Sequence, residues 1–234
     1  SIWWNQAQRE IQPLIGSTTQ DRQADESFRA VIDYRYQKKS SVWKLKGAWV
    51  ADQLQFNAQA NQTSQGLLGL DWELPSAGNL ALRAGVRGTW MDAKLSTYTA
   101  TEQRWEAYQS LGWQEGERIS VSLNLRQLAY PKELVPFLPG LGLDWRLFES
   151  DQTSLHLKTA FGLGLKLPTL NDRYWEPGGN PNLRPEKSQN GEVGFQLKQT
   201  GNFSWSQRLT YYRMQVDDWI IWLPKGNFWT PENI

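Results

Sequence analysis

The sequence predicts an all-β fold, an antiparallel meander of about ten or eleven long amphipathic strands, from three observations. Apolar and polar residues alternate along segments such as 28–36 and 141–147, which is the period of a strand with one buried face. Tight turns and longer polar or proline-rich loops separate these segments in alternation. The chain also combines 14 Trp, 8 Tyr and 8 Phe with a mean hydropathy of -0.62. This mixture fits a sheet with one apolar face and one wet face, although sugar-binding proteins share it.

Length, charge and composition exclude several classes of function. The 234 residues suffice for one large β domain, and a formal net charge of +1 provides no electrostatic footprint for nucleic acid. The chain has no Cys and a single histidine, His156, so no metal site and no cofactor are predicted. His156 itself is expected to be hydrogen-bonded or solvated on its strand. Neither a run of about 18 apolar residues nor the pattern of a signal peptide is present.

The first half of the chain predicts two hairpins of long strands, preceded by the end of an earlier strand. The apolar face of 28–36 carries Phe28, Ile32 and Tyr36, and the intervening positions are mostly polar. The strand end is predicted at 2–5 and a polar loop at 8–26. The first hairpin has strands at 28–36 and 43–51 with a turn at 38–41. A polar loop at 57–65 leads to the second hairpin, with strands at 68–74 and 80–90 and a turn at 75–79.

The second half repeats this pattern around one long loop. Between 167 and 188, four prolines each fix φ and remove a hydrogen-bond donor, and two glycines permit positive φ. These residues predict neither a helix nor a central strand there. A hairpin is predicted at 101–128 with its turn at 115–117, followed by a loop at 129–140. Strands at 141–147 and 155–165 are joined by a turn at 150–152, and the long loop 167–188 follows. Strands at 193–197 and 203–211 are joined by a turn at 199–202, and a last short element is predicted at 219–223.

The predicted strands of about 9 to 12 residues suit a tilted membrane crossing better than a soluble sheet. Short turns at one end and long loops at the other are typical of outer-membrane barrels, which have an apolar outer face and a polar lumen. A soluble sandwich or propeller, which allows the same alternation, is the alternative.

Two sets of side chains follow from this prediction. One set of basic residues falls on the polar face, where it would line a lumen and either guide anionic ligands or simply keep the wall solvated: Arg83, Arg87, Arg126, Lys158, Lys166 and Arg208. One set of tryptophans falls on the apolar face, where it would form membrane girdles or, as the alternative, stack on sugars: Trp49, Trp72, Trp90, Trp105, Trp113 and Trp145.

The sequence does not predict an enzyme. Asp217 and Asp218 are adjacent, so on a strand their side chains would point to opposite faces instead of sharing a substrate. One histidine does not support a Ser/His/Asp set, and no phosphate-binding loop is present.

The long loop carries a family resemblance. Its segments LPTLNDRYW and GGNPNLRPEKS resemble a barrel segment of the TonB-dependent outer-membrane receptors, the group that includes vitamin B12 and siderophore receptors. WWNQAQREIQPLIGSTTQDRQ and NFWTPENI resemble other barrel segments of the same group, so the resemblance spans the whole chain. The residues that carry the main motif, interpreted as shaping the loop more than as touching ligand, are Pro168, Gly179, Asn180, Pro181, Asn182, Leu183, Arg184, Pro185, Glu186 and Ser188.

The resemblance implies a location in the bacterial outer membrane and a barrel of about 22 strands with an N-terminal plug domain. Residues 1–234 would then be a part of that barrel, truncated at both ends and without the plug. The implied function is energy-dependent uptake of a scarce nutrient such as cobalamin or an iron chelate. The implied partners are membrane lipid, the nutrient and the TonB complex acting through the absent plug, with non-native self-association possible for the isolated piece. A soluble carbohydrate-binding β module is the alternative function, and a glycosidase-like β enzyme a third.

Overall fold

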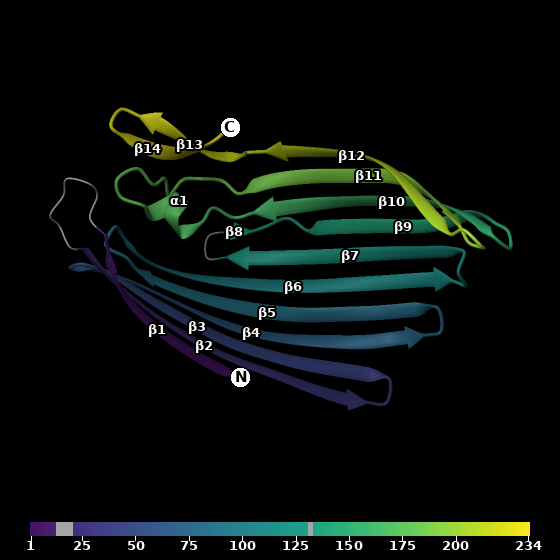
Figure 1. Cartoon of the computed structure of the whole chain (residues 1–234), viewed down its shortest axis with the longest axis horizontal. Helices are drawn as coiled ribbons and strands as arrows, with labels where there is room; N and C mark the ends of the chain where they lie inside the picture. Colours follow the sequence, from purple (N-terminus) through teal and green to yellow (C-terminus); the bar gives the residue numbers. More distant parts are fainter. Residues whose placement is uncertain (13–20, 131–132) are drawn as a thin grey trace.

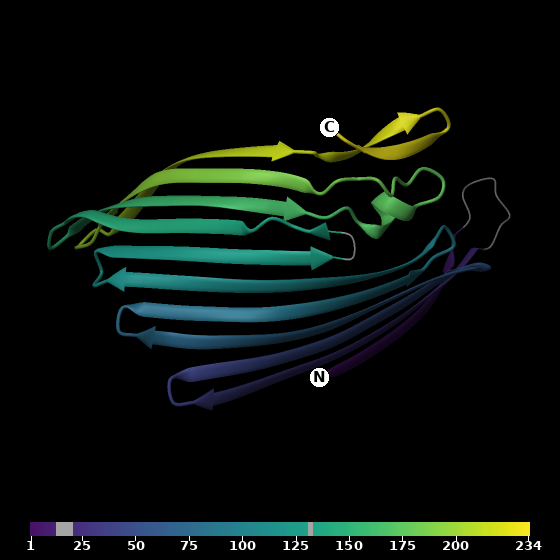
Figure 2. The same ribbon diagram turned by 180° about the vertical axis from the view of Figure 1, so that it is seen from behind.

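A computed structural model describes residues 1–12, 21–130 and 133–234. Eleven strands follow one another in chain order across a single curved, antiparallel sheet, which Figures 1 and 2 show from its two sides. Its strands are β1 (Ile2–Ile11), β2 (Asp21–Lys38), β3 (Ser41–Phe56), β4 (Gln59–Ala77), β5 (Leu80–Lys94), β6 (Thr99–Glu115), β7 (Ile119–Tyr130), β9 (Leu138–Glu149), β10 (Thr153–Lys166), β11 (Glu186–Gln199) and β12 (Trp205–Asp217).

Three smaller elements lie at one end of this sheet (Figure 1). The two-residue strand β8 (Glu133–Leu134) pairs with β7, and a separate hairpin is formed by β13 (Ile220–Lys225) and β14 (Phe228–Asn233). The only helix among the described residues is α1 (Leu170–Tyr174), and no described helix is long and apolar enough to cross a membrane. The fold-class prediction, an all-β meander of about ten or eleven strands, is confirmed.

All connections at one end of the sheet are tight turns, whereas the opposite end combines the tight β3–β4 turn with longer connections, so the predicted separation of short turns from long loops holds only in part. Tight turns join β2 to β3, β4 to β5, β6 to β7, β9 to β10 and β11 to β12 at one end, as the sequence predicts. Lys39, Gly78 and Gly116 adopt positive φ in three of these turns, a conformation that glycine tolerates best. The longest connection that the structure describes completely, between β10 and β11, lies at the opposite end together with α1 and the hairpin (Figure 1).

The two faces of the sheet are chemically opposite. Directly paired residues share a face, so the register places Asp71, Arg83 and Tyr108 on one face of β4, β5 and β6. We call this the polar face. The other face, which carries Val86 and Trp105, is called the apolar face.

Burial is reversed relative to a water-soluble domain. Asp71 and Glu102 on the polar face are each 4% exposed, whereas Val86 and Trp105 on the apolar face are 53% and 52% exposed. Large apolar side chains exposed to water at this scale would be unfavourable, because each buried methylene contributes about 0.8 kcal/mol. The arrangement therefore suits a sheet whose apolar face meets lipid.

Two predicted loops are mostly strand. In the predicted loop 8–26, the residues up to Ile11 belong to β1 and those from Asp21 onward belong to β2. Residues 13–20 lie outside the described residues. The predicted loop 57–65 shrinks to a tight turn, with Asn57 at φ 52°, and β4 begins at Gln59. Strands reach 19 residues in β4 instead of the predicted 9 to 12. The strand ends are polar on both faces, so they keep the pairing but lose the alternation that identifies a strand in sequence.

Three further predictions were wrong in part. The predicted loop 129–140 contains the end of β7, β8 and the start of β9, with 131–132 outside the described residues. The long loop 167–188 contains α1 and ends earlier than predicted, because β11 begins at Glu186. The last element, 219–223, is the first arm of a hairpin whose second arm holds Phe228–Asn233, where Pro231 interrupts the alternation.

Candidate functional site

The signature loop, residues 167–185, lies at the long-connection end of the sheet against the hairpin β13–β14, which we call the end hairpin (Figures 1 and 2). It joins β10 to β11 and carries most of the family motif. Pro168 is fully buried and Leu183 is only 6% exposed, so the loop has a packed interior of its own. It is a defined structure instead of a solvated connection.

A capping box explains the helix inside the signature loop. The Thr169 hydroxyl accepts a hydrogen bond from the Asp172 backbone N–H at 3.1 Å, and the Asp172 carboxylate accepts one from the Thr169 N–H at 2.9 Å. These bonds satisfy donors that a helix start leaves unpaired. The other Asp172 carboxylate oxygen accepts from Trp222 Nε1 at 3.0 Å, which connects α1 to the end hairpin. The sequence analysis missed this helix, although Thr169-x-x-Asp172 is its signal.

A buried ion pair holds α1 against the polar face of the sheet. The Arg173 guanidinium contacts the Glu102 carboxylate of β6, and both side chains are at least nine-tenths buried. Arg104 contacts the same carboxylate, so Glu102 has two cationic partners. Arg173 also lies 5.1 Å from the centre of the Tyr174 ring. Sequence reasoning did not identify Glu102, because residues 71 positions apart give no local signal.

Tyr98 adds a second attachment beside the ion pair. It lies in the connection between β5 and β6, and its hydroxyl donates to Asn171 Oδ1 at 2.5 Å. Burial raises the pKa of the Tyr98 phenol above its ordinary value, and the nearby Arg173 charge acts in the opposite direction. The neutral, hydrogen-bond-donating form is therefore favoured at physiological pH.

The first half of the family motif binds the end hairpin through the backbone. Asn180 Nδ2 donates to the Pro231 carbonyl at 3.1 Å, while Asn180 Oδ1 accepts from the Asn182 N–H at 3.1 Å. Gly178 has φ 117°, and a Cβ atom there would overlap the Trp229 carbonyl oxygen. Gly178 therefore permits the close approach of two backbones, and the Asn180 side chain links them.

The second half of the motif closes the same contact. The Arg184 N–H donates to Asn233 Oδ1 at 2.8 Å, and Asn233 Nδ2 returns a bond to the Arg184 carbonyl at 3.0 Å. The Arg184 side chain pairs with Asp218 at 2.5 Å. Glu186, 8% exposed, accepts from the Ile220 N–H at 3.0 Å through its carboxylate. The motif thus forms a clamp between the signature loop and the end hairpin.

The other motif residues lie within this clamp or at its border. Pro181 and Asn182 are exposed in a turn, and Pro185 is buried immediately before β11. Gly179 donates its N–H to the Trp175 carbonyl at 2.6 Å. Ser188 lies on β11 opposite Gly164 in the register.

All six basic residues predicted to share a face do lie on the polar face by register. Four have carboxylate partners: Arg83 with Asp71 and Glu73, Arg126 with Glu106, Lys158 with Asp144, and Lys166 with Glu186. Among the described residues, the partner of Arg208 is the Gln196 amide oxygen, at 3.5 Å, and Arg87 lies opposite Glu106. This face is therefore largely charge-balanced.

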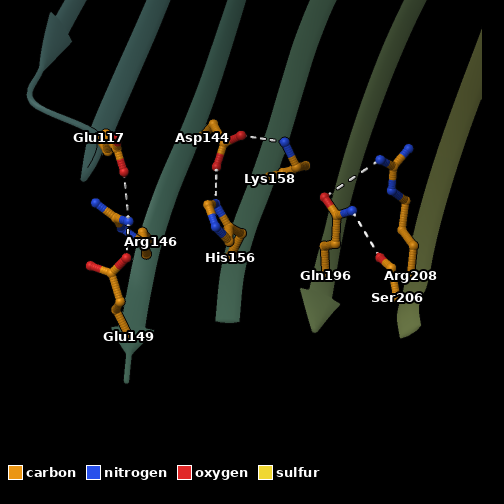
Figure 3. A network of polar contacts seen from close by, with 9 residues as sticks. All are labelled: Glu117, Asp144, Arg146, Glu149, His156, Lys158, Gln196, Ser206 and Arg208. Carbon is orange, nitrogen blue, oxygen red and sulfur yellow. Dashed lines mark hydrogen bonds and ion pairs between the residues drawn. The ribbon is translucent and has the colours of Figure 1, made fainter. Parts of the chain in front are cut away.

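His156 belongs to a polar network near the short-turn end of the polar face (Figure 3). Its Nδ1 lies 2.8 Å from Asp144 Oδ1, and Lys158 contacts the other oxygen of the same carboxylate. Arg146 pairs with Glu117 and Glu149 on one side of this group, as Figure 3 shows. Among the described residues, no group of three or more His, Asp and Glu side chains could hold a metal ion.

The six predicted tryptophans share the apolar face and fall into two groups. Trp72, Trp113 and Trp145 lie toward the short turns, and Trp72 lies 6.2 Å from Trp43 between ring centres. Trp49, Trp90 and Trp105 form the second group across β3, β5 and β6. Their placement at a membrane interface stays a prediction.

The two adjacent aspartates, Asp217 and Asp218, lie in different surroundings. Asp217 ends β12, whereas Asp218 lies outside the strand with φ 57° and is engaged by Arg184. The prediction placed both residues on one strand, which is wrong for Asp218.

A charge-balanced polar face, an exposed apolar face and a meander of long antiparallel strands define the wall of an outer-membrane β-barrel protein. Residues 4–234 match the family model described as "TonB dependent receptor-like, beta-barrel", and the chain belongs to this family. The family resemblance and the predicted location in the bacterial outer membrane are thereby confirmed.

Curated relatives match parts of the chain. The vitamin B12 transporter BtuB of Vibrio vulnificus is 43% identical over 76 residues, which covers 31% of this chain and 12% of that protein. BtuB of Photobacterium profundum is 37% identical over 103 residues, covering 41% and 16%. The matched segments thus span less than a fifth of these relatives, which are transporters and not enzymes.

Solved structures share the fold across nearly the whole chain. The siderophore receptor PirA from Pseudomonas aeruginosa superposes with a TM-score of 0.80 at 14% identity, covering 92% of this chain and 45% of that one. The Serratia marcescens hemophore receptor HasR gives 0.69 at 14% identity, covering 99% and 46%. The chain spans less than half the length of these receptors.

Proposed function

We propose that this chain forms part of the barrel wall of a receptor that takes up a scarce small-molecule nutrient across the outer membrane. The family match over residues 4–234 carries the proposal. Energy would come from the TonB complex, acting through a plug domain that lies elsewhere in the receptor. The outer edges of β1 and β12 pair with no further strand among the described residues, so additional strands, up to the about 22 of plugged transporters, would close the barrel.

In this receptor the polar face would line the lumen. Four of its six predicted basic residues are neutralised by carboxylates, which favours a solvated wall over a track for anionic ligands. Arg87, which has no carboxylate within ion-pair distance in the described structure, is the best candidate for contact with a plug or a ligand.

The clamp would have a structural role at the outer mouth. Its side chains are engaged with one another: Asn180, Arg184 and Glu186 each bond the end hairpin or the residues next to it. A ligand would have to displace these bonds to reach them, at a cost of about 1 kcal/mol for each neutral bond. The end hairpin, held in place by the clamp, is the more exposed surface for ligand contact.

Cobalamin is the first nutrient to test, because the curated relatives are named vitamin B12 transporters. Ferric siderophores are the second, since likeness to siderophore receptors at 14% identity supports the fold alone. Uptake of radiolabelled cobalamin and of a ferric siderophore panel would be compared between the source bacterium and a strain lacking the gene. We expect uptake of one ligand to fall to background and to be abolished equally by loss of TonB. Unchanged uptake of every ligand in the deletion strain would refute the proposal.

A further inference from the structure

A shallow hollow lies on the apolar face of the sheet, near the middle of β5 and β6. It has a volume of about 440 Å³. The small residues Ala84 and Ala107 form its floor, and larger side chains of β3, β4 and β7 stand around it. The residues that define it are Trp43, Leu70, Ala84, Ala107, Gln109 and Leu125. We call it the mid-wall hollow.

One polar side chain, Gln109, lies in the mid-wall hollow. Directly paired residues share a face, and Gln109 pairs with Ala84 of β5 and with Leu125 of β7. Along β6 its neighbours on the same face are Ala107 and Leu111. The Gln109 amide is therefore surrounded by apolar side chains on all four sides.

The predicted tryptophan boundaries put Gln109 at the middle of the membrane. Trp105 and Trp113 lie on the same face of β6, four residues before and four residues after Gln109. Tryptophan concentrates at the two boundaries between hydrocarbon and headgroups. Four residues of a strand tilted by about 40° rise about 10 Å, so Gln109 lies about 10 Å from each boundary. Its side chain, with two methylene groups, is too short to reach either one.

Within the described chain, the Gln109 amide has no hydrogen-bond partner. The other amide near it on this face, Gln127, already donates to the Val135 and Leu128 carbonyls. Hydrocarbon offers neither donors nor acceptors, and an unpaired amide is strongly unfavourable there. A lipid acyl chain in the hollow would leave this cost in place. The hollow therefore calls for a partner that brings a polar group to mid-membrane depth.

We propose that the mid-wall hollow is the contact surface of a receptor homodimer, in which Gln109 of one copy bonds Gln109 of a second copy. A primary amide carries both donors and an acceptor, so it is complementary to itself. A two-fold axis along the membrane normal brings the same residue of both copies together at one depth. A protein of another sequence would need a polar group of its own at that depth, whereas a second copy always supplies it.

The floor of the hollow makes this contact possible. Ala84 and Ala107 flank Gln109 on the same face, and small residues let two membrane walls approach closely enough for interfacial side chains to meet. The proposal depends on the apolar face meeting lipid and not on the nutrient carried. A monomeric receptor would therefore leave the proposed uptake function untouched, and a receptor that carries a different nutrient would leave the dimer untouched.

Cysteine cross-linking of the full-length receptor in native outer membranes tests the contact. The 234 residues contain no Cys, so Ala107→Cys adds a single thiol to this part of the receptor and keeps Gln109. Oxidation with copper phenanthroline should give a disulfide-linked species of twice the receptor's mass. Val193→Cys, on the apolar face of β11 and 42% exposed, is the control and should stay monomeric. No cross-linked dimer, a cross-link to a protein of another mass, or equal yields from the two variants would overturn the proposal.

Gln109→Leu separates a dimer contact from a role inside one copy. It should lower the association constant of the dimer about tenfold in sedimentation experiments, because the amide bonds between the copies are lost. It should also raise the Tm of the dilute monomer, because an apolar side chain replaces an unpaired amide on the lipid face. Gln207→Leu, which removes an amide from the apolar face of β12, is the matched control and should dimerise like the native receptor. A Gln109→Leu receptor that dimerises as the control does, or whose monomer melts at a lower temperature than the native one, would contradict the proposal.

Discussion

The buried ion pair between Arg173 and Glu102 predicts a large and local effect of mutation. Removing one partner of a buried pair costs about 3 to 5 kcal/mol, because the remaining charge stays buried. In Arg173→Met, Glu102 keeps Arg104, so a cost near the lower limit, about 3 kcal/mol, is expected. In Glu102→Gln, Arg173 and Arg104 both lose their carboxylate and keep at most a neutral amide oxygen at position 102, so the cost should be higher.

Hydrogen exchange of residues 167–185 in the full-length receptor measures this cost directly. A loss of about 3 kcal/mol raises the opening equilibrium about 100-fold, and amides of the signature loop should exchange faster by that factor. Arg118→Met, at an exposed short turn, is the control. The double variant should recover part of the protection, because the buried Arg173 charge is then removed together with its partner and only the more exposed Arg104 loses its carboxylate. If Glu102→Gln exchanged no faster than Arg118→Met, or if the double variant were as open as Glu102→Gln, the reasoning would fail.

Three further predictions concern the clamp, its pH dependence and the membrane boundary. Gly178→Ala should release the end hairpin, because its Cβ atom would overlap the Trp229 carbonyl, and trypsin should then cut there faster than in the native receptor. Because burial raises the pKa of Tyr98, its contribution to stability is complete below about pH 10 and is lost as pH rises through the raised value. The loss of stability of the signature loop, followed by its susceptibility to trypsin relative to Tyr98→Phe at each pH, should appear only in that alkaline range, and Tyr98→Phe should not show it. Brominated lipids should quench Trp105 fluorescence more strongly when the bromines lie near the headgroups than when they lie at the bilayer centre; the opposite order would contradict the predicted interface.

The strands within the membrane could be predicted from the sequence because lipid and lumen force a strict alternation. Phe28 to Tyr36 and Leu141 to Leu147 show it, and both lie on the strands predicted. Beyond the bilayer both faces meet water, so Gln59 to Ser64 look like a loop in sequence while pairing fully with β3. Only the pairing partner identifies such a strand, and the partner is not a local property.

The candidate site could be located from the sequence but not assembled. Four prolines and the family motif mark the signature loop, in which Asn180 and Arg184 bond the end hairpin. Their partners, Pro231 and Asn233, lie about 50 positions away in sequence, where no pattern indicates contact. The five-residue helix α1 was missed because prolines dominate the loop, although the capping box lies between them.

The length of the strands has a consequence for what can touch this protein from outside the cell. A strand of 19 residues is about 60 Å long and, tilted by about 40°, rises nearly 50 Å, about twice the height of the apolar band of an outer-membrane barrel. If the excess stands at the long-connection end, a paired and hydrogen-bonded collar lifts the mouth well above the lipid headgroups. Antibodies and other soluble macromolecules would then meet rigid strand walls as well as loops, so an epitope formed by side chains of neighbouring strands should survive changes in loop sequence.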